Sequence, residues 1–349
     1  MGRLSTWLDT AKAILEVSNT NFLRCNAGSA EGSYGGGIGY SYIRSDDHHP
    51  DQSREERINI KDCTFDGGVG QNGVALLMHM STLNANISDV HVQNHAETSY
   101  IFCIFFYMEA DNELFTIKNA EFTGNSYNSK LHDGDCGGSG IWIAEAKPQD
   151  YLASLTVQFE DCNFTNNHSP GNGGAFGYDT SERLKGVDLI FTNCEFTGNT
   201  CDMSGGACHF ATKKTVEIYN CIFDNNICQG TRDASGGGAI SFYSSVELAI
   251  INDCTFSNCA APKGSIMYTN GGIKGVNISH CTFSDLNDQQ NSSVHLDVDS
   301  SARTFIFEHN DFINLTCVGD YGGSGLHIGT GRDCEISSCT FKGNKGEGQ

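Results

Sequence analysis

Carboxylates gather at two places in the sequence where they could act as acids, bases or metal ligands. Asp297 and Asp299 lie near Arg303, and Asp133 and Asp135 precede a glycine-rich segment. Enzymes that cleave polysaccharides need paired carboxylates, with a cation or a metal nearby on one exposed face. Both groups are therefore candidates for catalysis or calcium binding, and solvated loop carboxylates are the simpler interpretation of each.

Histidines offer two further candidates. The run from Asp46 to Asp51 includes His48 and His49 and could hold a divalent metal, although an exposed insertion loop explains it more simply. His91 and His95 are four residues apart, but they lie in an expected strand and its turn, so we expect them not to share a face. No nucleophile elbow, phosphate loop or zinc-type cysteine spacing is present in the sequence. We therefore expect no catalytic residue, no cofactor and no metal site.

The chain also contains sixteen cysteines, each with a thiol that could be reactive. Seven of them occupy one repeated position, each followed two residues later by phenylalanine: Cys63 and Phe65, Cys162 and Phe164, Cys194 and Phe196, Cys221 and Phe223, Cys254 and Phe256, Cys281 and Phe283, Cys339 and Phe341. A buried thiol packs as a small hydrophobe, and stacked in-register side chains seldom reach the torsion of a disulfide. We expect these pairs to form a structural ladder. Cys201 and Cys228 lie outside this position, and a disulfide between them is an open alternative.

The spacing of these pairs predicts the architecture that positions them. Phe164, Phe196, Phe223 and Phe256 recur at intervals of about 27 to 33 residues, a period typical of solenoids. A second phrase, Gly-Gly-Ala followed by an apolar residue, alternates with them. Because side chains alternate along a strand, Cys and Phe, two residues apart, share the inner face. The apolar residues upstream lie at the other set of alternate positions, so the chain must bend between the two groups for both to face inward. The phase changes at Asp or Asn, which tolerate left-handed backbone and so mark a corner: Asp62, Asp161, Asn193, Asn220 and Asp253.

Three short strands in each period predict an all-β fold, a right-handed single-stranded parallel β-helix of about eleven rungs. The chain has 41 glycines and only 4 prolines, which suits tight corners and uninterrupted ladders. We expect one β-helix domain over residues 19–349.

Leu4, Trp7, Leu8 and Leu15 recur at helical spacing and predict a capping helix over residues 1–18. The last rung, around Cys339 to Phe341, should be covered by further solenoid, by a partner or by another copy of the chain.

Charge limits the partners. The chain has 42 acidic and 21 basic residues and a formal net charge of -21, which opposes binding to nucleic acid or anionic membranes. No stretch of 18 consecutive apolar residues occurs, so we expect no direct membrane span. A protein or a glycan is the expected partner.

The ordered alternation of two tetrapeptides resembles a known repeat family. Gly-Gly-Ala-Ile occupies residues 237–240, and Phe-x-x-Asn occupies 122–125, 164–167, 196–199, 223–226 and 341–344. These repeats are similar to those of the chlamydial polymorphic outer membrane proteins and their relatives in other microbes, including protists. The resemblance implies a surface-exposed β-helix that acts as an adhesin and carries no catalytic residues.

Two functions remain open at this point. The first is a non-enzymatic structural or adhesin-like segment of a larger surface or assembly protein, located at the cell surface or outside the cell, with a cytoplasmic assembly as the alternative. The second is a carbohydrate-active β-helix enzyme, a polysaccharide lyase or hydrolase, or a glycan-binding module. Such a protein needs aromatic side chains grouped along one groove, for which Trp142, Tyr107 and Tyr243 are the starting points.

Overall fold

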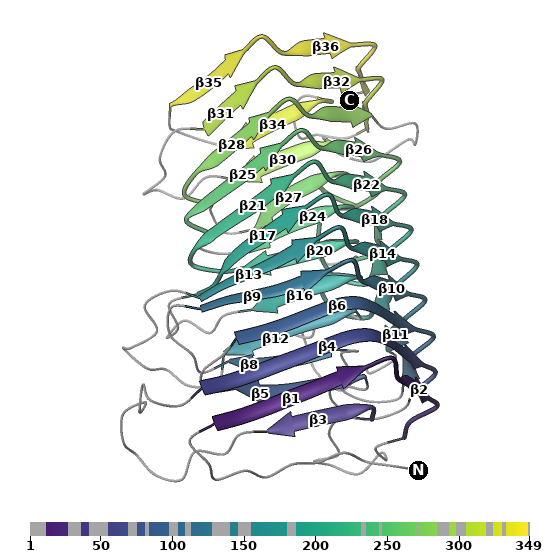
Figure 1. Ribbon diagram of the computed structural model, residues 1–349. Coiled ribbons are helices and arrows are strands. Elements are labelled where there is room, and N and C mark those ends of the chain that lie inside the picture. Colours follow the sequence, from purple (N-terminus) through teal and green to yellow (C-terminus); the bar gives the residue numbers. More distant parts are fainter. Residues whose placement is uncertain are drawn as a thin grey trace.

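The computed structural model describes most of the repeat region. The described residues are 12–26, 36–41, 55–68, 75–80, 84–97, 104–108, 113–127, 140–145, 155–179, 186–231, 235–243, 246–270, 273–284, 293–297, 305–318, 324–329 and 333–347. They form an all-β parallel solenoid and contain no helix. Figure 1 shows the coils stacked along one axis, from the N-terminal coils in purple to the C-terminal coils in yellow.

The largest sheet combines two series of strands. The first series is β1 (Lys12–Ser18), β4 (Glu55–Asp66), β6 (Asn84–Gln93), β9 (Glu113–Lys118), β13 (Leu155–Glu160), β17 (Asp188–Thr192), β21 (Thr215–Tyr219), β25 (Leu248–Asn252), β28 (Val276–Ser279), β31 (Phe305–Glu308) and β35 (Cys334–Ser337). The second is β2 (Asn21–Leu23), β10 (Glu121–Thr123), β14 (Asn163–Thr165), β18 (Glu195–Thr197), β22 (Ile222–Asp224), β26 (Thr255–Ser257), β29 (Thr282–Ser284), β32 (Asp311–Ile313) and β36 (Thr340–Lys342). Each strand pairs in parallel with its counterparts in the neighbouring coils.

A ten-stranded sheet follows the glycine phrases. Its strands are β3 (Ile38–Ser41), β5 (Leu76–Met80), β8 (Ile104–Met108), β12 (Ile141–Glu145), β16 (Phe176–Asp179), β20 (Cys208–Ala211), β24 (Ile240–Tyr243), β27 (Met267–Asn270), β30 (Val294–Asp297) and β34 (Leu326–Gly329). In the glycine phrase itself Gly237 has a φ of 76°, and a Cβ at Gly238 would meet the carbonyl oxygen of Ser265 in the next coil. Only glycine fits where the backbones of adjacent coils approach so closely.

Two small sheets complete the described part of the chain. They consist of β7 (Ala96–Glu97), β11 (Ser126–Tyr127), β15 (His168–Ser169), β19 (Thr200–Cys201) and β23 (Ile227–Cys228), and of β33 (Thr316–Val318) and β37 (Lys345–Glu347). In these coils a fourth strand of only two or three residues is therefore present besides the three strands expected per period. Several linking segments lie outside the described residues, so the expectation of about eleven rungs stays a prediction.

The interior contains a column of stacked rings, interrupted at Val92, which lies between Phe65 and Phe122. Phenylalanines at the same position of successive coils stack with centroids 4.7 to 5.1 Å apart, as in the pair Phe164 and Phe196 at 4.7 Å and 2°. Cys63, Cys162, Cys194, Cys221, Cys254 and Cys281 lie buried beside them, and Cys339 and Phe341 at the last described coil are partly buried and 51% exposed, respectively. The spacing of coils, about 4.8 Å, suits offset ring stacking.

The helix expected over residues 1–18 is wrong from Lys12 to Ser18, where the chain forms β1. Leu15 is 8% exposed while its neighbour Ile14 is 48% exposed, an alternation that belongs to a strand. Parallel pairing with β4, in which Leu15 lies opposite Ile58, overrides the helical spacing. Residues 1–11, and with them the rest of that prediction, lie outside the described residues.

Candidate functional site

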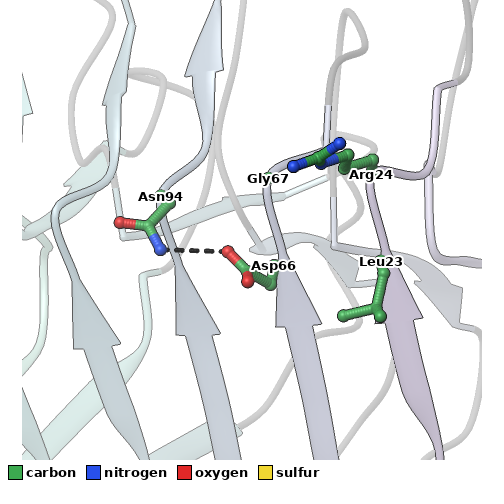
Figure 2. A pocket seen from close by; sticks show the side chains of 5 residues that line it. All are labelled: Leu23, Arg24, Asp66, Gly67 and Asn94. Carbon is green, nitrogen blue, oxygen red and sulfur yellow. Dashed lines mark hydrogen bonds between the residues drawn. The ribbon is translucent and has the colours of Figure 1, made fainter.

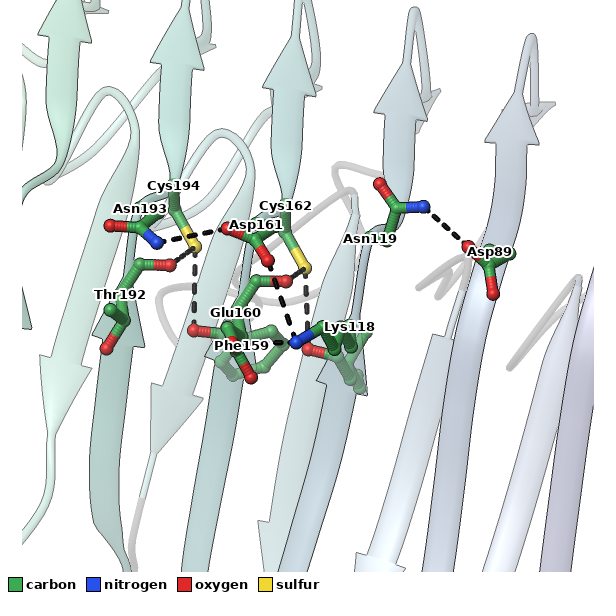
Figure 3. Close-up of polar contacts among 11 residues, drawn as sticks. Asp89, Lys118, Asn119, Phe159, Glu160, Asp161, Cys162, Thr192, Asn193 and Cys194 are labelled. Atoms are coloured by element: carbon green, nitrogen blue, oxygen red, sulfur yellow. Dashed lines mark hydrogen bonds and ion pairs between the residues drawn. The ribbon is translucent and has the colours of Figure 1, made fainter.

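The corner between the two strand series is the most polar repeated feature of the solenoid. All five predicted corner residues have positive φ, from 52° to 56°, as expected for left-handed backbone. Figure 3 shows two hydrogen bonds between corner side chains of successive coils. The amide of Asn193 donates to the carboxylate of Asp161 at 3.0 Å, and the amide of Asn119 donates to Asp89 at 2.5 Å. The corner carboxylates are thus hydrogen-bond acceptors within the fold.

The cysteines next to the corners are engaged in the same way. The thiol of Cys162 lies 3.3 Å from the carbonyl oxygen of Glu160 and 3.5 Å from that of Ile117, in the preceding coil. Cys194 repeats both contacts with Thr192 and Phe159 (Figure 3). Burial raises the pKa of the Cys63 thiol, in the same position, and this disfavours the thiolate that nucleophilic catalysis needs.

A cation and two carboxylates from distant parts of the sequence meet on the outer face of these coils. The ammonium of Lys118 lies 2.7 Å from Glu160 and 3.8 Å from Asp161 (Figure 3). The hydrogen bond to Glu160 raises the pKa of Lys118, so the amine stays protonated. A lysine that acts as a base requires the opposite shift. This exposed group is therefore an ion pair between coils.

An inward amide follows each phenylalanine of the central coils. Asn125, Asn167, Asn199 and Asn226 are fully buried, and each donates to the carbonyl of the phenylalanine or valine in the preceding coil at 2.8 to 2.9 Å. Buried polar groups require such partners. These asparagines complete the internal hydrogen bonding of the coils.

His95 occupies the same buried position, and His91 does not. The backbone N–H of Gly68 donates to Nδ1 of His95 at 2.9 Å, so Nε2 carries the proton that faces the carbonyl of Phe65. Burial lowers the pKa of His95 and favours this neutral form. His91 is exposed and pairs with Glu121 at 2.9 Å. The two histidines lie on different faces, as expected.

Cys201 and Cys228 are register partners on β19 and β23. Both are free and buried, and with Ala261 they form a small apolar cluster separate from the main core. Burial raises the pKa of Cys201, and the thiol of Cys228 donates to the carbonyl of Met203 at 2.8 Å. The structure therefore places the two cysteines side by side, and a disulfide between them stays a prediction.

Most of the predicted chemical groups lie outside the described residues. These are Asp46 to Asp51, Asp133, Asp135, Asp299 and Arg303, while Asp297, Tyr107 and Trp142 are described only as strand backbone. Tyr243 is 47% exposed, and its ring centroid lies 6.2 Å from that of His209. Within the described ranges no three His, Cys, Asp or Glu side chains are arranged to hold a metal. The same ranges contain no helix long and apolar enough to cross a membrane.

One open pocket lies on the outer surface near the N-terminal coils. It has a volume of about 600 Å³ and is lined by Leu23, Arg24, Asp66, Gly67 and Asn94. Figure 2 shows that these residues come from three successive coils, with the amide of Asn94 donating to Asp66 at 3.0 Å. The pocket combines an exposed apolar side chain with a guanidinium, a carboxylate and an amide, a set that can hydrogen-bond a polyhydroxylated ligand.

Comparison with known proteins identifies the architecture. A family model described as a right handed beta helix region matches residues 102–349. No curated protein and no solved structure matches the chain.

Proposed function

Because the chain belongs to the right-handed β-helix family, we propose that it is a non-enzymatic structural or adhesin-like segment of a larger surface or assembly protein. One observation carries this proposal: the reactive side chains that recur in the repeat are used to join one coil to the next. The thiol of Cys162, the amide of Asn167 and the carboxylate of Asp161 each accept or donate a hydrogen bond between coils. Their recurrence reflects stacking and needs no catalytic explanation.

The Phe-x-x-Asn and Gly-Gly-Ala-Ile repeats support a relation to the polymorphic outer membrane protein repeats, with the cell surface as the location. The free outer faces of a regular solenoid suit this role, because extended repeat surfaces bind large protein or glycan partners. The net charge of -21 favours a neutral or basic partner over nucleic acid.

Turnover and binding separate this proposal from the enzyme alternative. The chain is incubated with uronate polymers and neutral glycans, with and without calcium, and is also tested for retention of the same polymers and of surface proteins on immobilised protein. We expect a neutral glycan or a surface protein to be retained and recovered intact, and the anionic uronate polymers not to be retained. New reducing ends or unsaturated products that disappear in Asp297→Asn or Asp299→Asn would establish the enzyme instead.

A glycan-binding module is the second candidate, and the pocket of Figure 2 is the observation that favours it. Arg24 and Asp66 provide a donor and an acceptor for sugar hydroxyls, and Leu23, 62% exposed, provides an apolar contact. Glycan-array binding should then weaken in Arg24→Gln and in Asp66→Asn and persist in Lys118→Gln, which removes an exposed cation elsewhere. Equal binding by all three variants would exclude the pocket as the glycan site.

A further inference from the structure

Two histidines occupy the left-handed corner in successive coils near the C-terminal end. His280 and His309 have φ values of 55° and 54°, and their rings stack with centroids 5.0 Å apart and an interplanar angle of 22°. Both side chains are exposed, His309 by 49%. A pair of imidazoles is thus presented to water from a fixed stretch of backbone.

The coil stack holds the pair in place. The backbone N–H of His280 donates to the carbonyl of Glu308 at 3.1 Å, and that of His309 donates to Ser337 at the same distance. Each histidine is followed by a buried side chain, Cys281 or Asn310, that hydrogen-bonds inside the coil. Because the backbone is held on both sides of each histidine, mainly the side chain can rotate. Little conformational entropy is therefore lost when a ligand binds the rings.

The pair differs from the corners of other coils. At those corners Asn and Asp join the coils by hydrogen bonds, as between Asn193 and Asp161 or between Asn220 and Asn193. Among the described residues no hydrogen bond joins the two imidazoles. His309 Nε2 lies 3.6 Å from a carboxylate oxygen of Glu308, and Asp253 is the exposed corner residue of the preceding coil. Ring nitrogens and nearby negative charge are therefore available to a cation.

We propose that His280 and His309 form a two-histidine site for a divalent transition metal, Cu²⁺, Ni²⁺ or Zn²⁺. Imidazole is a preferred ligand for these ions, whereas Ca²⁺ and Mg²⁺ require oxygen ligands. Metal–nitrogen bonds of about 2.0–2.1 Å bring two ligand nitrogens to roughly 3 Å, which rotation of the two side chains at stacked corners can supply. The protein provides two donors and water fills the other positions, consistent with the lack of any three-donor group in the described ranges.

Variants with asparagine test the site without disturbing the corner, because Asn193 and Asn220 occupy the same corner with φ of 55° and 52°. Tag-free, chelator-treated full chain is titrated with Cu²⁺, Ni²⁺ and Zn²⁺ by calorimetry, and the Cu²⁺ form is examined by electron paramagnetic resonance. We expect one ion per chain at this site, hyperfine coupling from two nitrogens, and an affinity that falls about 10-fold or more in His280→Asn or His309→Asn.

Two controls locate the ion. His91→Asn removes another exposed histidine and should leave binding unchanged. His327→Asn breaks the other stacked pair, in which the rings of His295 and His327 lie 4.4 Å apart. Unchanged affinity in the His280→Asn/His309→Asn double variant, or a loss confined to His327→Asn, would overturn the proposal. Circular dichroism of each variant checks that the solenoid is intact.

Discussion

Single buried polar residues determine how each coil is joined to the next. The position three residues after the phenylalanine is filled by Asn167 and its equivalents, by His95 in an earlier coil and by Cys259 in a later one. All three donate toward the carbonyl of the preceding coil's phenylalanine or valine, and for Cys259 that carbonyl belongs to Phe223, 3.7 Å away. This position therefore requires a side chain that points inward and donates a hydrogen bond, and asparagine, histidine and cysteine all do so.

Replacing Asn167 by alanine should show how much this position contributes to the free energy of unfolding. Its amide donates to Phe122 at 2.9 Å and its oxygen accepts from the backbone N–H of Asn125 at 3.1 Å, so the variant leaves two buried groups unpaired. We expect the free energy of unfolding to fall by about 1–3 kcal/mol or more. Asn163→Ala, an exposed position on β14 of the same coil, is the control and should change it by less than about 0.5 kcal/mol. The midpoint of urea unfolding measures both, and equal shifts would contradict the assignment.

His209 should make the solenoid sensitive to acid. It is 5% exposed, its Nδ1 lies 2.7 Å from the hydroxyl of Ser241, and burial lowers its pKa to about 4. In the unfolded state this histidine binds a proton near pH 6.5, whereas in the folded state it stays neutral down to about pH 4. The free energy of unfolding therefore falls as the pH decreases from about 6.5 to about 4. The slope is about 1.4 kcal/mol per pH unit for one proton.

The measurement compares unfolding midpoints at pH 7 and pH 5. His209→Gln should show a smaller loss between the two pH values than the parent chain, whereas His91→Gln, at an exposed histidine, should keep the parent's dependence. If His209→Gln and the parent lose the same stability in acid, the buried neutral histidine is not the cause.

At the scale of the element, the strands are too short to be stable alone. β22 has only three residues, and its central Phe223 stacks on Phe196 at 4.7 Å and on Phe256 at 4.9 Å. The stability of each strand therefore comes from the coils above and below it. The left-handed residue before each strand of the second series, such as Asn220 before β22, turns the chain so that the apolar face stays inward across the bend.

Truncation within β22 tests this dependence. Phe223→Ala removes a fully buried ring from the middle of the column and should lower the free energy of unfolding by about 3–5 kcal/mol. The neighbouring Ile222 is 46% exposed, so Ile222→Ala should cost about 1 kcal/mol or less. Chemical denaturation followed by circular dichroism compares the two. A loss under about 1 kcal/mol for Phe223→Ala would mean that the ring column is not what stabilises the coils.

At the scale of the whole molecule, the stacking of coils buries nearly all the described cysteines. Cys334 is exposed, and Cys25 and Cys339 are partly exposed, whereas the other eleven described cysteines are buried. A high cysteine count therefore coexists with low thiol reactivity, because access and thiolate formation both decide the rate.

Thiol labelling should follow this division. We expect Cys334 to react first in the native chain, and the ladder cysteines, among them Cys194, Cys221 and Cys254, to react only after denaturation. Mass spectrometry of labelled peptides under non-reducing conditions reads every position and also shows whether Cys201 and Cys228 are joined. Cross-links among the ladder cysteines would contradict the packing role.

Features that depend on neighbouring residues in the chain could be predicted from the amino-acid sequence. Side-chain alternation is local, so Cys254 and Phe256 could be assigned to one inner face, and the left-handed preference of Asp and Asn marked Asn193 as a corner. The same local reasoning failed at Lys12–Ser18, because the pairing of β1 with β4 joins segments about 43 residues apart and outweighs helical spacing.

Which outward side chains meet depends instead on how distant segments of the chain pair in the fold. Lys118 reaches Glu160 across 42 residues of sequence, and His280 stacks on His309 across a different interval. The segments between strands vary in length from coil to coil, so the register that brings two polar residues together is set by backbone pairing and by the buried column of rings. A repeat pattern specifies the inside of such a solenoid, whereas the chemistry of its outer surface depends on how the coils are aligned.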